Sequence, residues 1–146
     1  LSSSSLGNDE VNARLFSTRA YSQVIFPSEE RLADFYPDGI SYFHSCADIT
    51  PFLPQIVTLR GLKTIHVSPW TDLEAVVKVA GRSLNLQRWM HPEDMILSVE
   101  GKRARLNEVF RSAERCRLTV VCAGAVADTV AWLNAVRPLL DGQPTG

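Results

Sequence analysis

From residue 40 onward, four short apolar runs alternate with stretches of mixed apolar and polar residues. Each run has the length and composition of a β-strand, and each is followed by a stretch with helical spacing. The four predicted strands span residues 40–44, 62–67, 84–88 and 118–122. Strands that alternate with helices predict an α/β fold with a parallel sheet and the helices outside it.

Several predicted helices have recognisable first and last residues. Thr71 and Glu74 have the spacing of a capping box, in which both side chains satisfy free backbone amides, and Gly81 follows as the helix-ending glycine. Asp128 can cap the last helix, which we expect Pro138 to disrupt. Together the pattern predicts four consecutive β-α units in a parallel sheet.

The part of the chain before the first predicted strand has a weaker pattern. The serine run near Leu1 buries too little surface to stay ordered, whereas residues 28–35 read as a helix. The expected organisation is a disordered leader at 1–10, a helical segment at 11–39, four β-α units at 40–140 and a flexible tail at 141–146.

Composition narrows the function classes. The 146 residues are 45% hydrophobic, enough for a real core, and their 15 basic and 16 acidic side chains form no long runs. We therefore expect no nucleic-acid partner and no membrane association. Residues 1–7 lack the features of a secretory signal, and three cysteines make no disulfide framework, so the expected compartment is the cytoplasm.

Candidate metal ligands lie at the carboxyl ends of two predicted strands. His44 and Cys46 follow the first strand, and Cys122 ends the fourth. If the extended backbone continues through residue 45, His44 and Cys46 point to the same side. One imidazole and two thiolates suit zinc and leave a fourth position open for a substrate. The alternative is that these cysteines are buried packing residues.

Other side chains at the same edge have less specific roles. Asp48 could orient His44, Arg88 could bind an anionic substrate or lie at the surface, and His91 could face the site or only shape a helix start. His66, in the middle of a predicted strand, is expected to be a core residue that hydrogen-bonds a neighbour.

The residues His44-Ser45-Cys46-Ala47-Asp48-Ile49-Thr50-Pro51-Phe52-Leu53 resemble a conserved segment of the uroporphyrinogen decarboxylase superfamily. The similarity is greatest to the branch of methylcobalamin:coenzyme M methyltransferases, and it extends over about residues 25–140. In that branch zinc is held by His-x-Cys and by a cysteine on the last barrel strand. The resemblance places Cys122 in this last position.

The resemblance implies a zinc-dependent methyltransferase-like protein in which zinc activates a small thiol to accept a methyl group from a corrinoid. It covers only the carboxyl-terminal half of an eight-unit TIM-type barrel, which implies that residues 40–140 form a (β/α)4 half-barrel. We therefore expect a partner, either a second copy in a homodimer, which would place Cys122 near the partner's site, or a complementary amino-terminal half. An open sheet covered by residues 1–40 is the alternative.

Two other functions remain open. Ala47 stands where the family usually has glycine, and the amino-terminal half is not matched; both favour a catalytically inactive superfamily member that acts as a binding or assembly module. A tetrapyrrole decarboxylase-like enzyme is the third possibility.

Overall fold

The computed structural model describes residues 4–114, 116–122 and 126–141, and within them five parallel strands form one sheet. The strand order β1-β2-β3-β4-β5 is the order along the chain. The strands are β1 (Ser5–Gly7), β2 (Tyr42–His44), β3 (Thr64–Val67), β4 (Asn85–Trp89) and β5 (Arg117–Val121). The α/β class is therefore confirmed, and the four predicted strands are β2 to β5.

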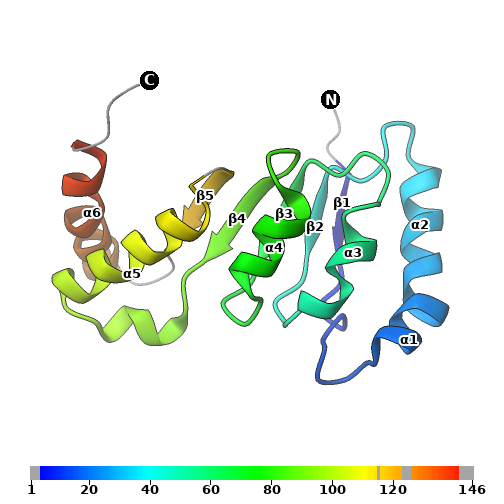
Figure 1. The fold of residues 1–146 in the computed structure, drawn as a ribbon, viewed down its shortest axis with the longest axis horizontal. Coiled ribbons are helices and arrows are strands. Elements are labelled where there is room, and N and C mark those ends of the chain that lie inside the picture. Colours follow the sequence, from blue (N-terminus) through cyan, green and yellow to red (C-terminus); the bar gives the residue numbers. More distant parts are fainter. Residues whose placement is uncertain (1–3, 115, 123–125, 142–146) are drawn as a thin grey trace.

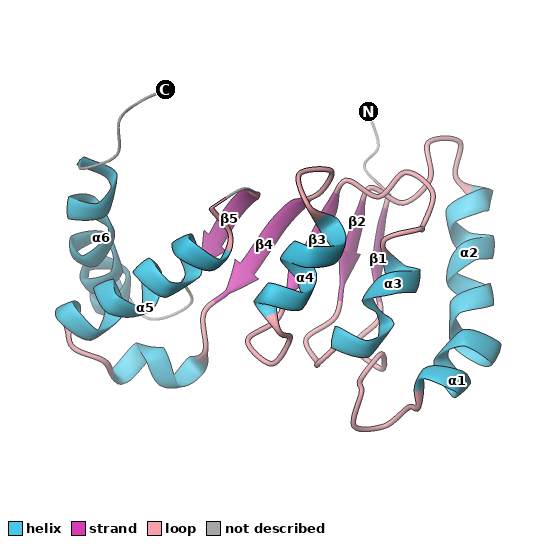
Figure 2. Cartoon of the chain, in the orientation of Figure 1, coloured by secondary structure: helices cyan, strands magenta, loops and turns pink. Residues whose placement is uncertain are grey.

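Helical segments connect each strand to the next (Figure 2). They are α1 (Thr18–Ala20), the π-helix η1 (Tyr21–Ile25), α2 (Phe26–Phe35), the 3-10 helix η2 (Thr50–Phe52), α3 (Leu53–Ile56), α4 (Leu73–Ala80), the 3-10 helix η3 (Pro92–Ile96), α5 (Val99–Ser112) and α6 (Val126–Asp141). Helix α3 contacts α4, α4 contacts α5, and α5 contacts α6. The helices thus follow one another as the strands do, with α3 and α4 in front of the sheet (Figure 1). Chain-order pairing of parallel strands is compatible with part of an α/β barrel.

Strand β1 lies in the segment that we expect to be disordered. Its residues pair with β2 in a parallel register, Leu6 opposite Phe43 and Gly7 opposite His44. The Ser41 amide also donates to the Ser4 carbonyl at 2.8 Å. The expectation of disorder over residues 1–10 is thus wrong from Ser4 onward, because a strand at a sheet edge is held by backbone hydrogen bonds that polar serines make as well as apolar residues do.

The two faces of the sheet differ in chemistry. Phe43, Ile65 and Leu86 are opposite one another on β2, β3 and β4, and all three are fully buried, at 0% exposure. They belong to the same hydrophobic core as the apolar side chains of α3 and α4, so we call this side the helix face. The alternate positions form the polar face, on which lie Tyr42, His44, His66 and Gln87.

Two glycines fix the turn that leads into β2. Gly39 has φ +75° and Gly61 has φ +83°, and a Cβ on Gly39 would lie 2.0 Å from the Arg60 carbonyl oxygen. The Ile40 amide donates to the same carbonyl at 2.8 Å. This close approach holds the chain just before β2 against the chain just before β3 and so fixes where the two strands begin.

Three predicted helix ends are wrong, one of them Asp128, which lies within the first turn of α6 and is therefore not its N-cap residue. Helix α4 is capped by Asp72, whose Oδ1 accepts from the amides of Glu74 and Ala75, and not by Thr71, whose hydroxyl bonds elsewhere in the fold. Helix α6 continues through Pro138 to Asp141, because an internal proline removes only one backbone donor and a helix can kink to accommodate it.

The remaining expectations concern the two ends of the chain and the membrane. Within 11–39 the helical segments α1, η1 and α2 occur as expected. The predicted tail at 141–146 lies outside the described residues apart from Asp141, the last residue of α6. Among the described residues, no helix has both the length and the apolar character needed to cross a membrane.

Candidate metal centre

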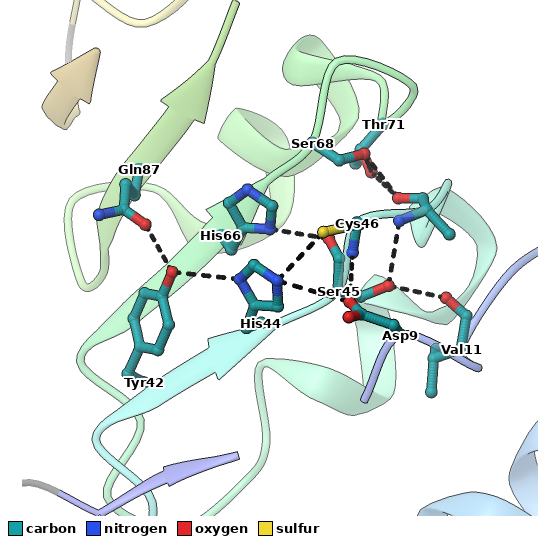
Figure 3. Close-up of polar contacts among 11 residues, drawn as sticks. Asp9, Val11, Tyr42, His44, Ser45, Cys46, His66, Ser68, Thr71 and Gln87 are labelled. Carbon is teal, nitrogen blue, oxygen red and sulfur yellow. Dashed lines mark hydrogen bonds and ion pairs between the residues drawn. The ribbon is translucent and has the colours of Figure 1, made fainter. Parts of the chain in front are cut away.

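His44 and Cys46 lie together where β2 ends. His44 is the last residue of β2, and its Nε2 lies 3.2 Å from the Cys46 Sγ (Figure 3). Both side chains leave the backbone on the same side of the extended segment, as the alternation of a strand requires. The spacing of His-x-Cys therefore produces the close pair of a nitrogen and a sulfur ligand that the sequence indicates.

Asp9 supplies a third ligand atom from the turn after β1. Its Oδ1 accepts a hydrogen bond from the Cys46 amide at 2.9 Å and lies 3.4 Å from the His44 Nε2. The carboxylate oxygen, the imidazole nitrogen and the thiol sulfur all lie within 4.8 Å of one another. Among the described residues, this is the one group of three or more such side chains that could hold a metal ion.

The hydrogen bond from the Cys46 amide is the main cause that lowers the pKa of Asp9. The carboxylate is therefore ionised at neutral pH. The pKa of Cys46 shifts in the opposite direction, raised by burial and then by the neighbouring Asp9. A cysteine nucleophile needs a lowered pKa, so Cys46 without a cation is a poor nucleophile. A divalent cation between these groups would favour the thiolate, as a ligand set requires.

His66 holds the segment between the two ligands. Its Nδ1 lies 2.7 Å from the Ser45 carbonyl oxygen, which can only accept, so this nitrogen carries the proton. Its ring is stacked on the His44 ring, with 4.2 Å between centroids. Burial is the main cause that lowers the pKa of His66. The expectation that His66 is a core residue bonded to a neighbour is confirmed.

Buried hydroxyl groups fix the backbone that follows Cys46. The hydroxyls of Ser68 and Thr71 donate to the Ala47 carbonyl at 2.6 Å and 3.0 Å. The Ser45 hydroxyl donates to the Val11 carbonyl at 2.9 Å. The ligand-bearing turn is thus tied to the loop after β1 and to the loop after β3, which reduces the conformational freedom that a bound ion would otherwise have to remove.

Cys122 does not join this group in the single chain. It follows β5, which is separated from β2 by three strand spacings of about 4.8 Å, or roughly 14 Å. In the structure, Asp9 is the third residue of the group, the role that the sequence analysis assigns to Cys122. Cys122 is half-buried, and burial raises the pKa of its thiol. A role for Cys122 as a ligand from a partner chain stays the sequence-based alternative to Asp9.

The other three candidate side chains have structural contacts. Asp48 accepts from the Thr50 amide at 2.9 Å and from its hydroxyl at 2.5 Å, so its carboxylate fixes the turn that leads into η2 and not the orientation of His44. Arg88 donates to the carbonyls of Ser68 and Thr71, at 2.6 Å and 3.0 Å, and thus braces the loop after β3.

His91 shapes a helix start, one of the two roles that the sequence allows. Its Nδ1 accepts from the Glu93 amide at 3.1 Å at the beginning of η3. Its ring stands edge-on to the Trp70 ring, with centroids 4.4 Å apart. His91 is therefore a capping residue.

Sequence reasoning missed Asp9 because the serine-rich segment around it was set aside as a leader. The available signal is the polar pair Asn8-Asp9 after Leu6-Gly7, which resembles a short strand followed by a functional turn. No protein-family model, curated protein or solved structure matches this chain. What defines its class is therefore the fold and the site: an α/β protein with a carboxylate, an imidazole and a thiol gathered at the carboxyl edge of its sheet.

Proposed function

We propose that this chain is a zinc-binding, methyltransferase-like protein that activates a thiol. The observation that carries the proposal is the Asp9–His44–Cys46 group, whose ligand atoms lie within 4.8 Å of one another. Oxygen, nitrogen and sulfur ligands of this kind suit Zn²⁺, whereas a thiolate disfavours Mg²⁺ and Ca²⁺. Three protein ligands leave one position of a tetrahedral site open, as catalytic zinc sites do.

In this proposal Asp9, His44 and Cys46 hold the ion, and His66, Ser68 and Thr71 keep the ligand-bearing turn in place. Zinc, when bound, supplies the charge that keeps a substrate thiol ionised at neutral pH. The ionised sulfur would then form a bond to the methyl carbon of a methylated corrinoid, the co-substrate, and the thiol proton would pass to solvent. The cobalt–carbon bond would break with its electron pair left on cobalt. The corrinoid donor and the small thiol acceptor rest on the family resemblance.

A direct assay is methyl transfer by the zinc-loaded chain. Methylcobalamin and a small thiol are mixed with the protein, and the loss of the methylcobalamin spectrum is followed against the free thiol alone. We expect zinc-dependent transfer that Cys46→Ser removes and that Cys122→Ser retains. If stoichiometric zinc binds and no transfer occurs, the catalytic part is wrong and the metal-binding or assembly module becomes the better reading.

We further propose that the sheet is one wall of a TIM-type barrel. Support comes from the sequential strand order, the helices that follow one another along the sheet, and the polar side chains on the other face. The five strands in the described part of the chain leave three of an eight-stranded barrel to be supplied, which favours a complementary segment over a second copy. Light scattering tests this: a stable homodimer would support the second copy instead.

The three cysteines are free thiols, which fits our proposal of a reducing, cytoplasmic setting.

A further inference from the structure

Three side chains form a hydrogen-bonded row across the polar face of the sheet. Gln87 lies on β4, Tyr42 on β2, and the row passes over β3 between them (Figure 3). The Tyr42 hydroxyl lies 2.5 Å from the Gln87 Oε1 and 3.4 Å from the His44 Nδ1. The row therefore ends on the ring nitrogen of His44 that faces away from Asp9 and Cys46.

The direction of each hydrogen bond follows from the groups themselves. The Gln87 Oε1 is only an acceptor, so the phenol donates its single proton there. The Tyr42 oxygen then meets His44 as an acceptor, which favours the neutral tautomer that carries its proton on Nδ1. This leaves the lone pair on Nε2, the nitrogen that lies 3.2 Å from the Cys46 sulfur.

We propose that Tyr42, oriented by Gln87, is a positioning residue that fixes the Nδ1–H tautomer of His44 and so presents Nε2 to a metal ion. The inference rests on the proposed metal site at Asp9, His44 and Cys46. A histidine ligand generally donates its other ring N–H to a partner, and loss of such a partner weakens metal binding by about 10–100-fold. Here the partner is a phenol oxygen.

The other neighbours of His44 sharpen what must be measured. The Asp9 carboxylate, 3.4 Å from Nε2, favours a proton on that nitrogen when no ion is bound. His66 is stacked on the ring and offers it no hydrogen bond. Tyr42 is thus the described group that favours the Nδ1–H form, and its effect is a shift in the balance between the two tautomers.

The first test is nuclear magnetic resonance of the ¹⁵N-labelled, zinc-free chain. At about pH 8.5, two units above the usual histidine pKa, the ring nitrogen shifts report which nitrogen of His44 carries the proton. Tyr42→Phe removes the acceptor and keeps the ring, so the Nδ1–H fraction should fall. Tyr36→Phe, at a tyrosine that is 41% exposed and outside the row, is the control and should change nothing.

Gln87 variants separate position from bulk. Gln87→Leu removes the acceptor and lets the phenol proton turn toward His44, so it should lower the Nδ1–H fraction as Tyr42→Phe does. Gln87→Glu keeps an acceptor oxygen and should restore it. Zinc affinity, measured by competition with a chelator, should fall by about tenfold in Tyr42→Phe and Gln87→Leu and stay near wild type in Gln87→Glu.

The outcomes distinguish this inference from the function on which it rests. An unchanged tautomer balance in Tyr42→Phe overturns the positioning role, even if zinc affinity falls. If Tyr42→Phe shifts the tautomer balance of His44 but the wild-type chain binds no zinc, the role of Tyr42 is supported and the proposed metal site is overturned. A normal circular dichroism spectrum for each variant confirms that the fold is intact.

Discussion

The helix face and the polar face of the sheet are built from alternate residues of the same strands. The helix face packs in the core, whereas the polar face carries the candidate site. On β2 and β3, Phe43 and Ile65 are fully buried in the core, while their neighbours His44 and His66 form hydrogen bonds and ring contacts around the candidate site. A strand turns successive side chains to opposite faces, so stability and chemistry can occupy adjacent positions. Changes one residue apart should therefore have different consequences.

The largest expected effect is on the helix face. Phe43→Ala removes a fully buried ring next to Ile65 and should lower the free energy of unfolding by about 3–5 kcal/mol. Tyr42→Phe, one residue earlier on the polar face, should change it by less than about 1 kcal/mol. Urea denaturation of both variants at neutral pH measures the difference. Similar losses of unfolding free energy in the two variants would mean that both faces contribute equally to stability.

A smaller loss is expected where a buried hydroxyl ties the ligand turn to the loop after β3. Ser68→Ala leaves the Ala47 carbonyl with only the Thr71 hydroxyl and should cost about 1–3 kcal/mol. Ser28, whose exposed hydroxyl accepts from Arg31 on α2, is the matched control, and Ser28→Ala should cost much less. The same denaturation experiment gives both values, and equal costs would contradict a special role for the buried hydroxyl.

The smallest expected effect concerns a buried carboxyl group on helix α2. Glu29 of α2 accepts from the Tyr21 hydroxyl at 2.6 Å and from the Asn8 side chain at 2.9 Å, and burial raises its pKa above the ordinary 4.5. A carboxyl with a raised pKa in the folded state contributes stability below its unfolded pKa and loses it as pH rises through the folded value.

Wild type should therefore gain stability relative to Glu29→Gln when pH is lowered from about pH 8 to about pH 5. Denaturation curves at the two pH values measure this gain, and Glu30→Gln, at the exposed neighbouring carboxyl, is the control. The prediction is contradicted if the difference in free energy of unfolding between wild type and Glu29→Gln does not change with pH. It is also contradicted if the wild type loses stability relative to Glu29→Gln at the lower pH.

Much of the fold could be predicted because its signals are local. The short apolar runs at residues 40–44, 62–67, 84–88 and 118–122 predict β2 to β5 to within a few residues. The His-x-Cys spacing likewise places two ligands on one side of a strand end. Both inferences need only the geometry of an extended backbone.

The remainder depended on tertiary contacts that local patterns do not contain. β1 exists because its backbone pairs with β2, and this pairing brings Asp9 to Cys46, 37 positions away in sequence. Thr71 has the spacing of a helix cap, but its hydroxyl is used by the Ala47 carbonyl, so Asp72 takes the cap. Asp48 and Arg88 lie at the predicted edge, yet Asp48 accepts from the Thr50 amide and Arg88 donates to the Ser68 carbonyl instead of contacting the candidate site.

The measurement that tests the central claim most directly is a Co²⁺ titration of the full chain, followed by the thiolate-to-cobalt absorption band. The account predicts a band that saturates at one ion per chain, is lost in Cys46→Ser, is weakened in Asp9→Asn and is retained in Cys122→Ser. A wild-type chain without the band, or a band lost in Cys122→Ser and kept in Cys46→Ser, would contradict a site made of Asp9, His44 and Cys46.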